Sequence, residues 1–404
     1  MFGRASVFLV LGFSGILLLY TQNLFTFSSD SVDIYTQYYR NTMAENVATS
    51  AANFACNKFF LDPTWTSGYS NVSFNGGTFS ATVSSVGSNR KKITATGTYS
   101  GITKTVEVIF QPSSFARFGY YGAIMPGNLY YVTGDTVSGP MHVQGKLNVW
   151  GSPVFTGKVT TKNGLKKFDA ATDPQFLGGY ESGVNLPLPS TLNTVSADAS
   201  SGGRLFSNTD VWLTFNSNGS VDYKVGAAGT WTNVALSTFA PNGVIAVDKG
   251  NLHIKGTLNG KVTLGATLSS GTSNGNIYLD DNIVYNTDPM SPNCPDMLGL
   301  VATNNVIITD NVPNKSDIIV NASIFSLKGG LKAENYSTIP YCGSIRLTGG
   351  LIEYQAQATG VFDPYSGTIT NGYNSNIRFD ERFMTHVPPS FPTSTTFEVL
   401  TWFE

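Results

Sequence analysis

The feature that most constrains the fold is a run of uncharged residues near the start of the chain. Residues 5–29 contain no Asp, Glu, Lys or Arg, and Arg4 stands directly before them. As a helix this run spans ~37 Å, more than the ~30 Å hydrocarbon core of a bilayer. Arg4 before it and Asp30 and Asp33 after it favour a cytoplasmic N-terminus with the remainder outside. Residues 1–29 are therefore expected to form a single-pass membrane anchor.

A cleaved signal peptide is the alternative interpretation of the same run. Residues 7–20 have the length of a signal-peptide core. Residues 21–27, however, do not offer the two small residues, one position apart, that precede a signal-peptide cleavage site. A retained anchor is therefore the favoured interpretation.

A second helix is predicted directly after the anchor. Residues 31–61 contain no Pro or Gly, and their apolar positions step by three or four, as on one face of an amphipathic helix. The sequence Asp62-Pro63 ends it. With no breaker between them, the two helices should form a single rod of roughly 55 residues. Small side chains on its last turns would let a neighbouring element approach closely. These candidate packing residues are Ala44, Ala48, Ala51, Ala52 and Ala55.

Short alternating runs between residues 72 and 110 predict a small antiparallel sheet. Turn sequences separate these runs, and the clearest are Asn-Gly-Gly at 75–77 and Ser-Gly at 100–101. The second helix and this sheet are expected to form one domain over residues 30–118.

A membrane-emergent helix whose outer half packs on a β-sheet resembles type IV pilins and the pseudopilins of type II secretion, especially the minor PilX-like pilins. The N-terminal sixty residues carry the resemblance, including a short leader, Met1-Phe2-Gly3, before Arg4 and the apolar run. The resemblance implies leader processing between Gly3 and Arg4, a place in the bacterial cell envelope, and pilin-like partners.

One position departs from the pattern of major pilins. Those proteins place Glu five residues after the cleavage point, where it neutralises the N-terminal amine of a neighbouring subunit. Cleavage after Gly3 puts Phe8 at that position, and no acidic residue precedes Asp30. The resemblance therefore implies a tip-like or non-polymerising member rather than a self-polymerising major subunit.

The rest of the chain has the composition of an exported β protein. Of 404 residues only 12% are charged, about half the usual share, while 42 are Gly. The net charge of −2 provides no basic surface for nucleic acid. The expected fold class is therefore α+β and mostly β, without a nucleic-acid partner.

Glycines recur at an interval of six between residues 134 and 161, with β-branched or apolar residues between them. They are Gly139, Gly145, Gly151 and Gly157. Short strands that turn at glycine and stack on the next turn are typical of a parallel β-helix. The pattern predicts a right-handed β-helix over residues 119–164 and 241–360, although the fixed interval is lost after residue 161. An antiparallel β-sandwich or jelly roll is the alternative.

Two further segments lie outside the β-helix pattern. Residues 165–240 are expected to be an inserted loop region with a small hairpin around 211–223. Residues 361–404 contain a proline cluster, 388–392, and are expected to form an extended C-terminal tail ending in a short strand.

Most of the chain has a second resemblance. The stretches 133–159, 298–306 and 388–402 are similar to bacterial envelope proteins that have PilX-like N-termini. This resemblance implies location and architecture rather than an activity.

The cysteines offer one candidate disulfide. Cys294 and Cys342 lie in loop-like sequences outside the membrane, where a bond closing ~48 residues would add ~4 kcal/mol. Two free thiols remain an equal alternative, because the two α-carbons must come within ~7 Å. Cys56 lies in the alanine-rich helix and is expected to be a small buried residue.

Signs of enzymatic chemistry are sparse. The three histidines, His142, His253 and His386, are far apart, and no Cys-x-x-Cys motif is present. Asp280-Asp281 is the densest acidic group, but neighbouring residues of a strand point to opposite faces. No catalytic residue, cofactor or metal site is predicted.

Aromatic residues offer a candidate sugar-stacking surface, with interior stacking as the alternative. They are Tyr120, Tyr121, Tyr130, Tyr131 and Trp150. The sequence predicts a non-enzymatic structural or adhesive envelope protein, anchored in the inner membrane with its bulk periplasmic or surface-exposed. The alternative is a membrane-tethered protein that binds or degrades polysaccharide. A cleft with two converging carboxylates beside exposed aromatics would favour that alternative.

Overall fold

The structure is a computed structural model. The residues that it describes are 3–87, 90–291, 293–363 and 368–403. Met1 and Phe2 of the predicted leader, and residues 364–367 and Glu404 of the predicted tail, lie outside these ranges.

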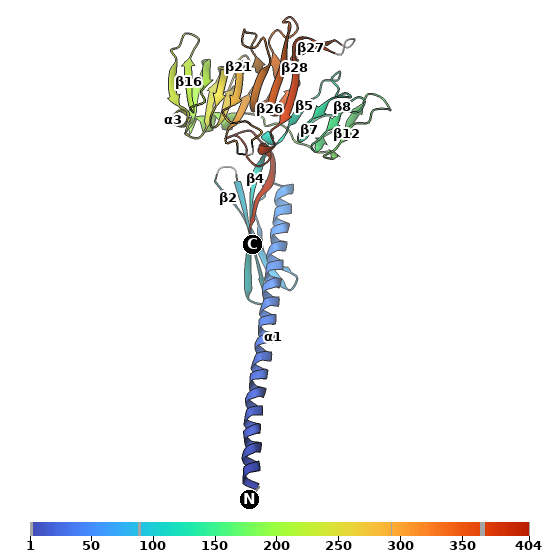
Figure 1. Cartoon of the computed structure of the whole chain (residues 1–404), viewed down its shortest axis with the longest axis vertical. Helices are drawn as coiled ribbons and strands as arrows, with labels where there is room; N and C mark the ends of the chain where they lie inside the picture. The colour runs from blue at the N-terminus through green and yellow to red at the C-terminus, as the bar shows by residue number, and fades with distance from the viewer. Residues whose placement is uncertain (1–2, 88–89, 292, 364–367, 404) are drawn as a thin grey trace. The chain divides into compact units, whose positions relative to one another are not determined.

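The chain divides into two compact units, and unit 1 is built on one helix. Unit 1 comprises residues 1–112 and 396–404. Helix α1 (Gly3–Leu61) is continuous over 59 residues, so the single rod predicted from the sequence is confirmed (Figure 1). At 1.5 Å per residue its length is about 90 Å. The helix ends directly before Asp62-Pro63, the predicted stop.

An antiparallel sheet packs on the C-terminal half of α1, as the sequence predicted. Its strands follow the order β1-β2-β3-β4-β29. They are β1 (Tyr69–Phe74), β2 (Gly77–Val86), β3 (Arg90–Tyr99), β4 (Ile102–Ser114) and β29 (Thr393–Phe403). Asn75 and Gly76 both have positive φ, 48° and 77°. This combination makes the tight turn of the β1–β2 hairpin.

Small residues set the distance between α1 and the sheet. The five predicted packing alanines, from Ala44 to Ala55, have no exposed surface. Opposite them, a Cβ added at Gly97 of β3 would lie 2.2 Å from the backbone nitrogen of Ala48 and 2.8 Å from the carbonyl oxygen of Ala44. The helix and strand backbones therefore approach so closely that neither surface has room for a larger side chain.

Unit 2, residues 113–395, is dominated by short parallel strands, here called the parallel stack. Its first part follows a 3₁₀ turn at Phe115–Arg117. The strands of this part are β5 (Tyr120–Ile124), β6 (Thr136–Val137), β7 (Met141–Val143), β8 (Leu147–Val149), β9 (Val154–Phe155), β10 (Val159–Thr161), β11 (Leu165–Lys167), β12 (Gln175–Phe176) and β13 (Tyr180–Ser182).

The six-residue glycine interval corresponds to one side of the turn in which it occurs. Met141 of β7 pairs in parallel with Val159 of β10, 18 positions later. The β8–β11 and β6–β9 ladders have the same separation of 18 positions. Three ladders with six residues each account for the turn, and this is why glycine recurs every six residues where the chain changes direction.

The second part of the stack contains longer strands and three helical turns. These elements are α2 (Asn193–Ser200), β14 (Arg204–Ser207), β15 (Val211–Phe215), β16 (Ser220–Val225), β17 (Thr232–Ala235), α3 (Leu236–Phe239), β18 (Val244–Asp248), β19 (Leu252–Leu258), β20 (Lys261–Thr267), β21 (Ile277–Tyr285), β22 (Met297–Ala302), β23 (Val306–Ile308), β24 (Ile318–Ser326), β25 (Leu331–Ala333), β26 (Tyr341–Gln355), β27 (Gly360–Asp363), β28 (Thr368–Phe379) and a 3₁₀ turn at Glu381–Met384.

Three parallel ladders also organise this second part. The first runs through β14, β18, β20, β22, β24 and β26. The second runs through β15, β19, β21, β23 and β25. The third joins other segments of β19, β21, β24 and β26 with β28. Buried Val, Ile and Leu side chains from all three ladders form one core with those of the first part.

Strand β5 joins the two parts of the stack at a junction here called the seam. One edge of β5 pairs in parallel with β7, and the other edge pairs in parallel with the last residues of β26. Among the described strands, no second ladder crosses the seam: β25 and β28 end their ladders on one side, while β6-β9-β12 and β8-β11 are separate sheets on the other.

The two segments expected outside the β-helix pattern differ from that expectation. In the predicted insertion, 165–240, strands β11 to β13 continue the first part of the stack, and β14 and β15 begin the ladders of the second. The hairpin predicted around 211–223 is present as β15–β16. In the predicted tail, 361–404, β28 extends the stack and β29 joins the sheet of unit 1. Because the turns differ in length, these strands do not recur at a fixed interval in the sequence.

The parallel pairing also argues against the antiparallel alternative that the sequence left open. A β-sandwich or jelly roll pairs its strands antiparallel. In unit 2, antiparallel ladders among the described strands are confined to β15–β16–β17 and β27–β28. Unit 2 is therefore a mostly-β region of parallel strands.

Replacing Gly97 by Ala should destabilise unit 1. The added methyl group would meet helix backbone at 2.2 Å, so α1 and β3 must separate. We expect Gly97→Ala to lower the free energy of unfolding by about 1–3 kcal/mol, the usual cost of overpacking. Chemical unfolding of the full chain, followed by circular dichroism, measures it. Gly15→Ala is the control, because nothing lies within 4 Å of its added Cβ; an equal effect of both variants would contradict the close approach.

Candidate functional site

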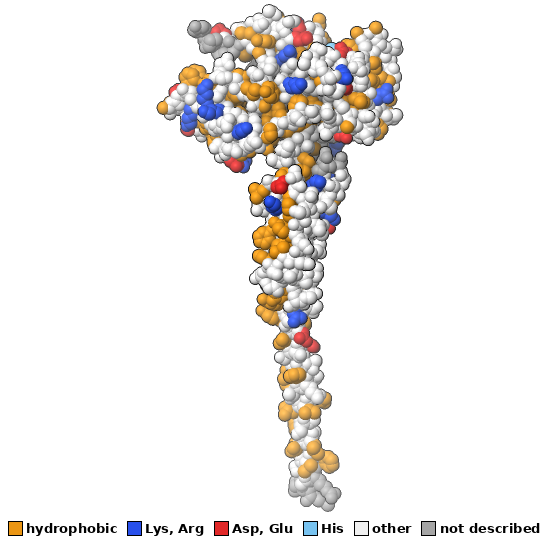
Figure 2. All heavy atoms as spheres, turned by 180° about the vertical axis from the view of Figure 1, so that it is seen from behind, with side chains coloured by type: hydrophobic (Ala, Val, Ile, Leu, Met, Phe, Trp, Pro, Cys, Tyr) orange, Lys and Arg blue, Asp and Glu red, His pale blue; other side chains and the backbone are white. Residues whose placement is uncertain are grey.

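Apolar side chains along the first half of α1 are uncovered. Of the described helices, α1 alone is long and apolar enough to cross a membrane; its apolar window has a mean hydropathy of 1.7 and is 0% buried. Figure 2 shows apolar side chains along this part of the helix. A continuous apolar surface of this size is unfavourable in water and marks contact with lipid or with another protein.

The cysteines of the candidate disulfide are free, buried thiols, as is Cys56. The Cys294 thiol lies 3.4 Å from the carbonyl oxygen of Thr287, and the Cys342 thiol 3.1 Å from that of Pro340. Cys294 precedes β22 and Cys342 lies in β26, with β24 between these two strands. Two strand spacings of ~4.8 Å exceed the ~7 Å reach of a disulfide. Of the two alternatives that the sequence left open, a disulfide and two free thiols, the structure has two free thiols.

The histidines and the acidic pair of the sequence have structural partners. His142 is buried, with its ring nitrogens 2.7 and 2.9 Å from Thr160 and Gln144. His253 lies 3.2 Å from the carboxylate of Asp280. Among the described residues, no group of three or more His, Cys, Asp or Glu side chains is arranged to hold a metal ion.

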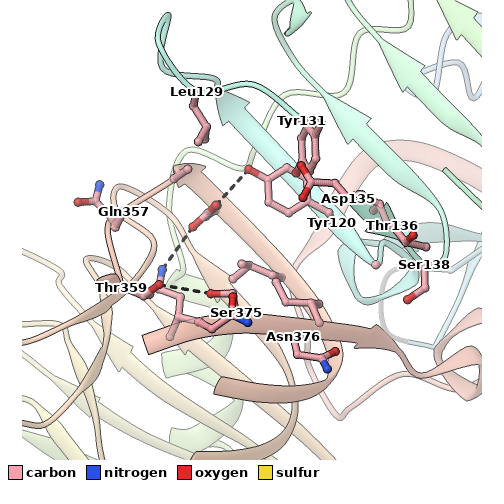
Figure 3. A pocket seen from close by; sticks show the side chains of 18 of the residues that line it. Tyr120, Leu129, Tyr131, Asp135, Thr136, Ser138, Gln357, Thr359, Ser375 and Asn376 are labelled. Atoms are coloured by element: carbon pink, nitrogen blue, oxygen red, sulfur yellow. Dashed lines mark hydrogen bonds between the residues drawn. The ribbon is translucent and has the colours of Figure 1, made fainter. Parts of the chain in front are cut away.

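The seam contains a pocket of about 480 Å³, here called the seam pocket (Figure 3). One wall is formed by β5 and the connection 129–138, and the other by β26, β28 and the segment 356–359. The pocket lies where the β5–β26 ladder crosses the seam and the neighbouring ladders stop. The cavity is thus a consequence of joining the two parts of the stack along one ladder.

Glu353 of β26 is the buried acidic group of this pocket. Its side chain is 3% exposed. Its Oε1 accepts a hydrogen bond from the Tyr120 hydroxyl at 3.1 Å, and its Oε2 accepts one from the Leu331 backbone nitrogen at 3.3 Å. Burial raises the pKa of Glu353 to about 7, although both hydrogen bonds favour the ionised form. Near neutral pH the pocket therefore contains Glu353 in both protonation states.

A second carboxyl group, that of Asp135, also lines the pocket. It accepts a hydrogen bond from the Val132 backbone nitrogen at 2.7 Å, and burial raises its pKa. Tyr131 is close to both acids: burial, then the charges of Glu353 and Asp135, raise the pKa of its hydroxyl. The pocket thus combines two carboxyl groups with buried tyrosines.

Exposed aromatic side chains stand beside the seam pocket. A neighbouring cavity shares Tyr130 and Asp135 with it and is also lined by Trp150. Trp150 stacks on Phe168 with ring centroids 4.3 Å apart, and Phe168 meets the Tyr130 ring edge-on at 5.6 Å. We call Tyr130, Trp150 and Phe168 the aromatic rim.

The structure divides the aromatic residues that the sequence offered for sugar stacking. Trp150 is exposed at the rim, whereas Tyr130 and Tyr131 are both half-buried. Tyr120 and Tyr121 are buried, and the Tyr121 hydroxyl donates to the carbonyl oxygen of Leu186 at 2.7 Å. These five residues therefore include both exposed and interior positions.

Sequence reasoning missed Glu353 and Asp135. The signal for Glu353 was an acidic residue inside the apolar strand 351–354, where a charge has no place without a partner. Its partner Tyr120 is 233 positions away, so no local pattern connects the two. Asp135 lies in a turn sequence, Thr-Gly-Asp, that gives no hint of a pocket.

Comparisons with known proteins do not identify a family for this chain. No protein-family model matches the chain, and no curated protein matches it in sequence. Among solved structures, the competence-associated pilin ComZ from Thermus thermophilus is similar at 12% identity and a TM-score of 0.34, over 90% of this chain and 97% of that chain. A TM-score this low does not establish a shared fold.

Glu353 should make stability depend on pH. Its pKa is raised from 4.5 to about 7 in the folded protein. Between these values the folded state binds more protons than the unfolded state, so this contribution to stability is lost as pH rises and is fully lost above pH 7. The variant Glu353→Gln lacks this titration. Relative to the variant, the native protein should lose about 3 kcal/mol between pH 4.5 and 8.

Urea unfolding of both proteins across this pH range measures the difference. Any fixed cost of the substitution, such as a weaker bond to Tyr120, cancels because only the change with pH is compared. A stability difference that stays constant from pH 4.5 to 8 would show that Glu353 is not buried in the way the structure describes.

Proposed function

We propose that this chain is a pilin-like component of the bacterial cell envelope, anchored by α1 in the inner membrane with its bulk outside the cytoplasm. The observation that carries the proposal is the form of α1. One 59-residue helix has an uncovered apolar half, and its other half packs through small residues on an antiparallel sheet. This is the arrangement of a helix that leaves a membrane and supports a head domain.

The residues that follow the apolar run support the placement of the membrane boundary. Asp30 and Asp33 are the first acidic residues, and the exposed side chains of Tyr35 and Tyr38 lie one to two turns beyond. Tyrosines are enriched at the level of lipid headgroups, where their rings are half in lipid and their hydroxyls reach water. Residues 5–29 then occupy the hydrocarbon core.

Within this proposal the protein acts by contact rather than by catalysis. The uncovered half of α1 would associate with other helices of a type IV pilus or secretion-type assembly, as in a minor PilX-like pilin. Unit 2, proposed as a β-helix, would present a structural or adhesive surface. Phe8, in place of the Glu of major pilins, fits a member that does not polymerise on itself.

A second candidate function is carbohydrate binding by a membrane-tethered protein. The seam pocket favours it, because two carboxyl groups lie in one cavity with exposed aromatic side chains beside it. This candidate concerns unit 2 and is compatible with the same anchor.

A charge placed in the middle of the apolar run should abolish stable membrane insertion. Arg or Lys at the centre of a membrane helix costs about 2.5–3.5 kcal/mol. We therefore expect Leu17→Arg to lower the equilibrium ratio of membrane-bound to extracted full-length protein by roughly 100-fold. Alkaline carbonate extraction measures this ratio. Leu177→Arg is the matched control, because Leu177 is an exposed leucine of unit 2. If Leu17→Arg stays membrane-bound to the same extent as the control, α1 is not a membrane anchor.

A further inference from the structure

The seam is the place where the parallel stack opens to solvent. In a continuous stack every turn is covered by the next on all sides. At the seam the first ladder continues from β26 to β5. Among the described strands, β25 pairs with no strand beyond β23, and β28 pairs beyond β26 only with β27, so neither of these ladders crosses the seam. Leu331 of β25 and residues 374–377 of β28, together with the connection 129–138, line part of the cavity. A cavity of this size is of the order of a small-molecule site.

The wall of the seam pocket is rich in amide and hydroxyl groups. Gln357, Asn374 and Asn376, which are exposed, supply carboxamides. The Thr359 and Ser375 hydroxyls are 3.3 Å apart, and Figure 3 marks the hydrogen bond between them. Carboxamides and hydroxyls both donate and accept hydrogen bonds. Such groups match a ligand that itself carries many hydroxyls, each a donor and an acceptor.

The charges around the pocket disfavour anionic ligands. The two acidic groups described above, Asp135 and Glu353, line it, and neither Lys nor Arg occurs among the described residues that line the seam pocket or the neighbouring cavity. A phosphate or uronate inside the cavity would meet like charge, because the cation at the rim, Lys166, stands over the Tyr130 ring and is not among the residues that line the cavity. The cavity lining therefore disfavours an anionic ligand.

The aromatic rim provides a flat apolar surface at the entrance. Trp150 is 46% exposed although its indole could have been buried in the core. One ring face of Trp150 is held by Phe168 at an interplanar angle of 26°, which orients the indole without covering the whole side chain. A rigid, half-covered ring suits the apolar C–H face of a sugar, because it gives contact area with little loss of side-chain entropy.

We propose that the seam pocket and the aromatic rim together bind an uncharged oligosaccharide, with one sugar unit in the pocket and the next stacked on Trp150. Tyr130 and Asp135 line both cavities, so a single ligand can reach both the amides of the pocket wall and the rim. The inference deepens the second candidate function and is independent of the role of α1.

The test is calorimetric titration of the full-length protein in a detergent without a sugar headgroup. The probes are cellohexaose, maltohexaose and chitohexaose, with hexagalacturonate as the acidic comparison. We expect at least one neutral hexasaccharide to bind, with hexagalacturonate at least tenfold weaker. Trp150→Ala should weaken binding about tenfold, and Asn376→Ala about threefold or more.

Trp231→Ala is the matched control, because Trp231 is 48% exposed in the same unit and does not line either cavity. It should change the affinity by less than twofold, and unchanged circular dichroism and thermal unfolding of each variant establish that it is folded. Absence of binding to all three neutral probes would overturn the proposal. Equal loss in Trp150→Ala and Trp231→Ala, or tighter binding of hexagalacturonate, would also overturn it. None of these results bears on membrane anchoring, which carbonate extraction of the same variants reports separately.

Discussion

The structure depends first on the apolar surface of residues 5–29, which has no partner within the described chain. In a bilayer only a continuous helix satisfies its own backbone hydrogen bonds over that length. Because α1 continues without a break to Leu61, the helix that is proposed to meet lipid also contributes to the core of unit 1. Gly97 and the alanines from Ala44 to Ala55 then allow the sheet to lie directly on the helix backbone. The proposed anchor and the helical part of unit 1 are thus one continuous helix.

Helix α1 and the 18-residue turn of the first part of the stack were predictable, because both depend on local sequence patterns. The uncharged run, the absence of Pro and Gly between residues 31 and 61, and the stop at Asp62-Pro63 determine α1. The glycine interval between 139 and 157 determines an 18-residue turn, since each side of the turn takes six residues. Ala48 could be recognised as a packing residue, but not its contact with Gly97, which follows from the register of β3.

The second part of the stack and the seam pocket depend on contacts between residues far apart in the sequence, which no local pattern indicates. The connections in the second part of the stack differ in length, so the period disappears although the ladders continue. The seam joins β5 to β26, and the 233 positions between Tyr120 and Glu353 hide both the pairing and the pocket. The candidate disulfide, one of two equal alternatives from the sequence, is not formed for a related reason. Cys294 precedes β22 and Cys342 lies in β26, and β24 pairs with both of these strands and so separates them.

The most direct test of the central claim is the intact mass and N-terminal sequence of the protein recovered from purified envelopes and from sheared surface filaments. The account predicts that residues 5–29 are retained, so the chain begins at or before Arg4, and that some of it is recovered with filaments. A mature chain that begins beyond residue 20 would contradict the account, because it would lack the helix on which both the anchor and the pilin-like proposal depend.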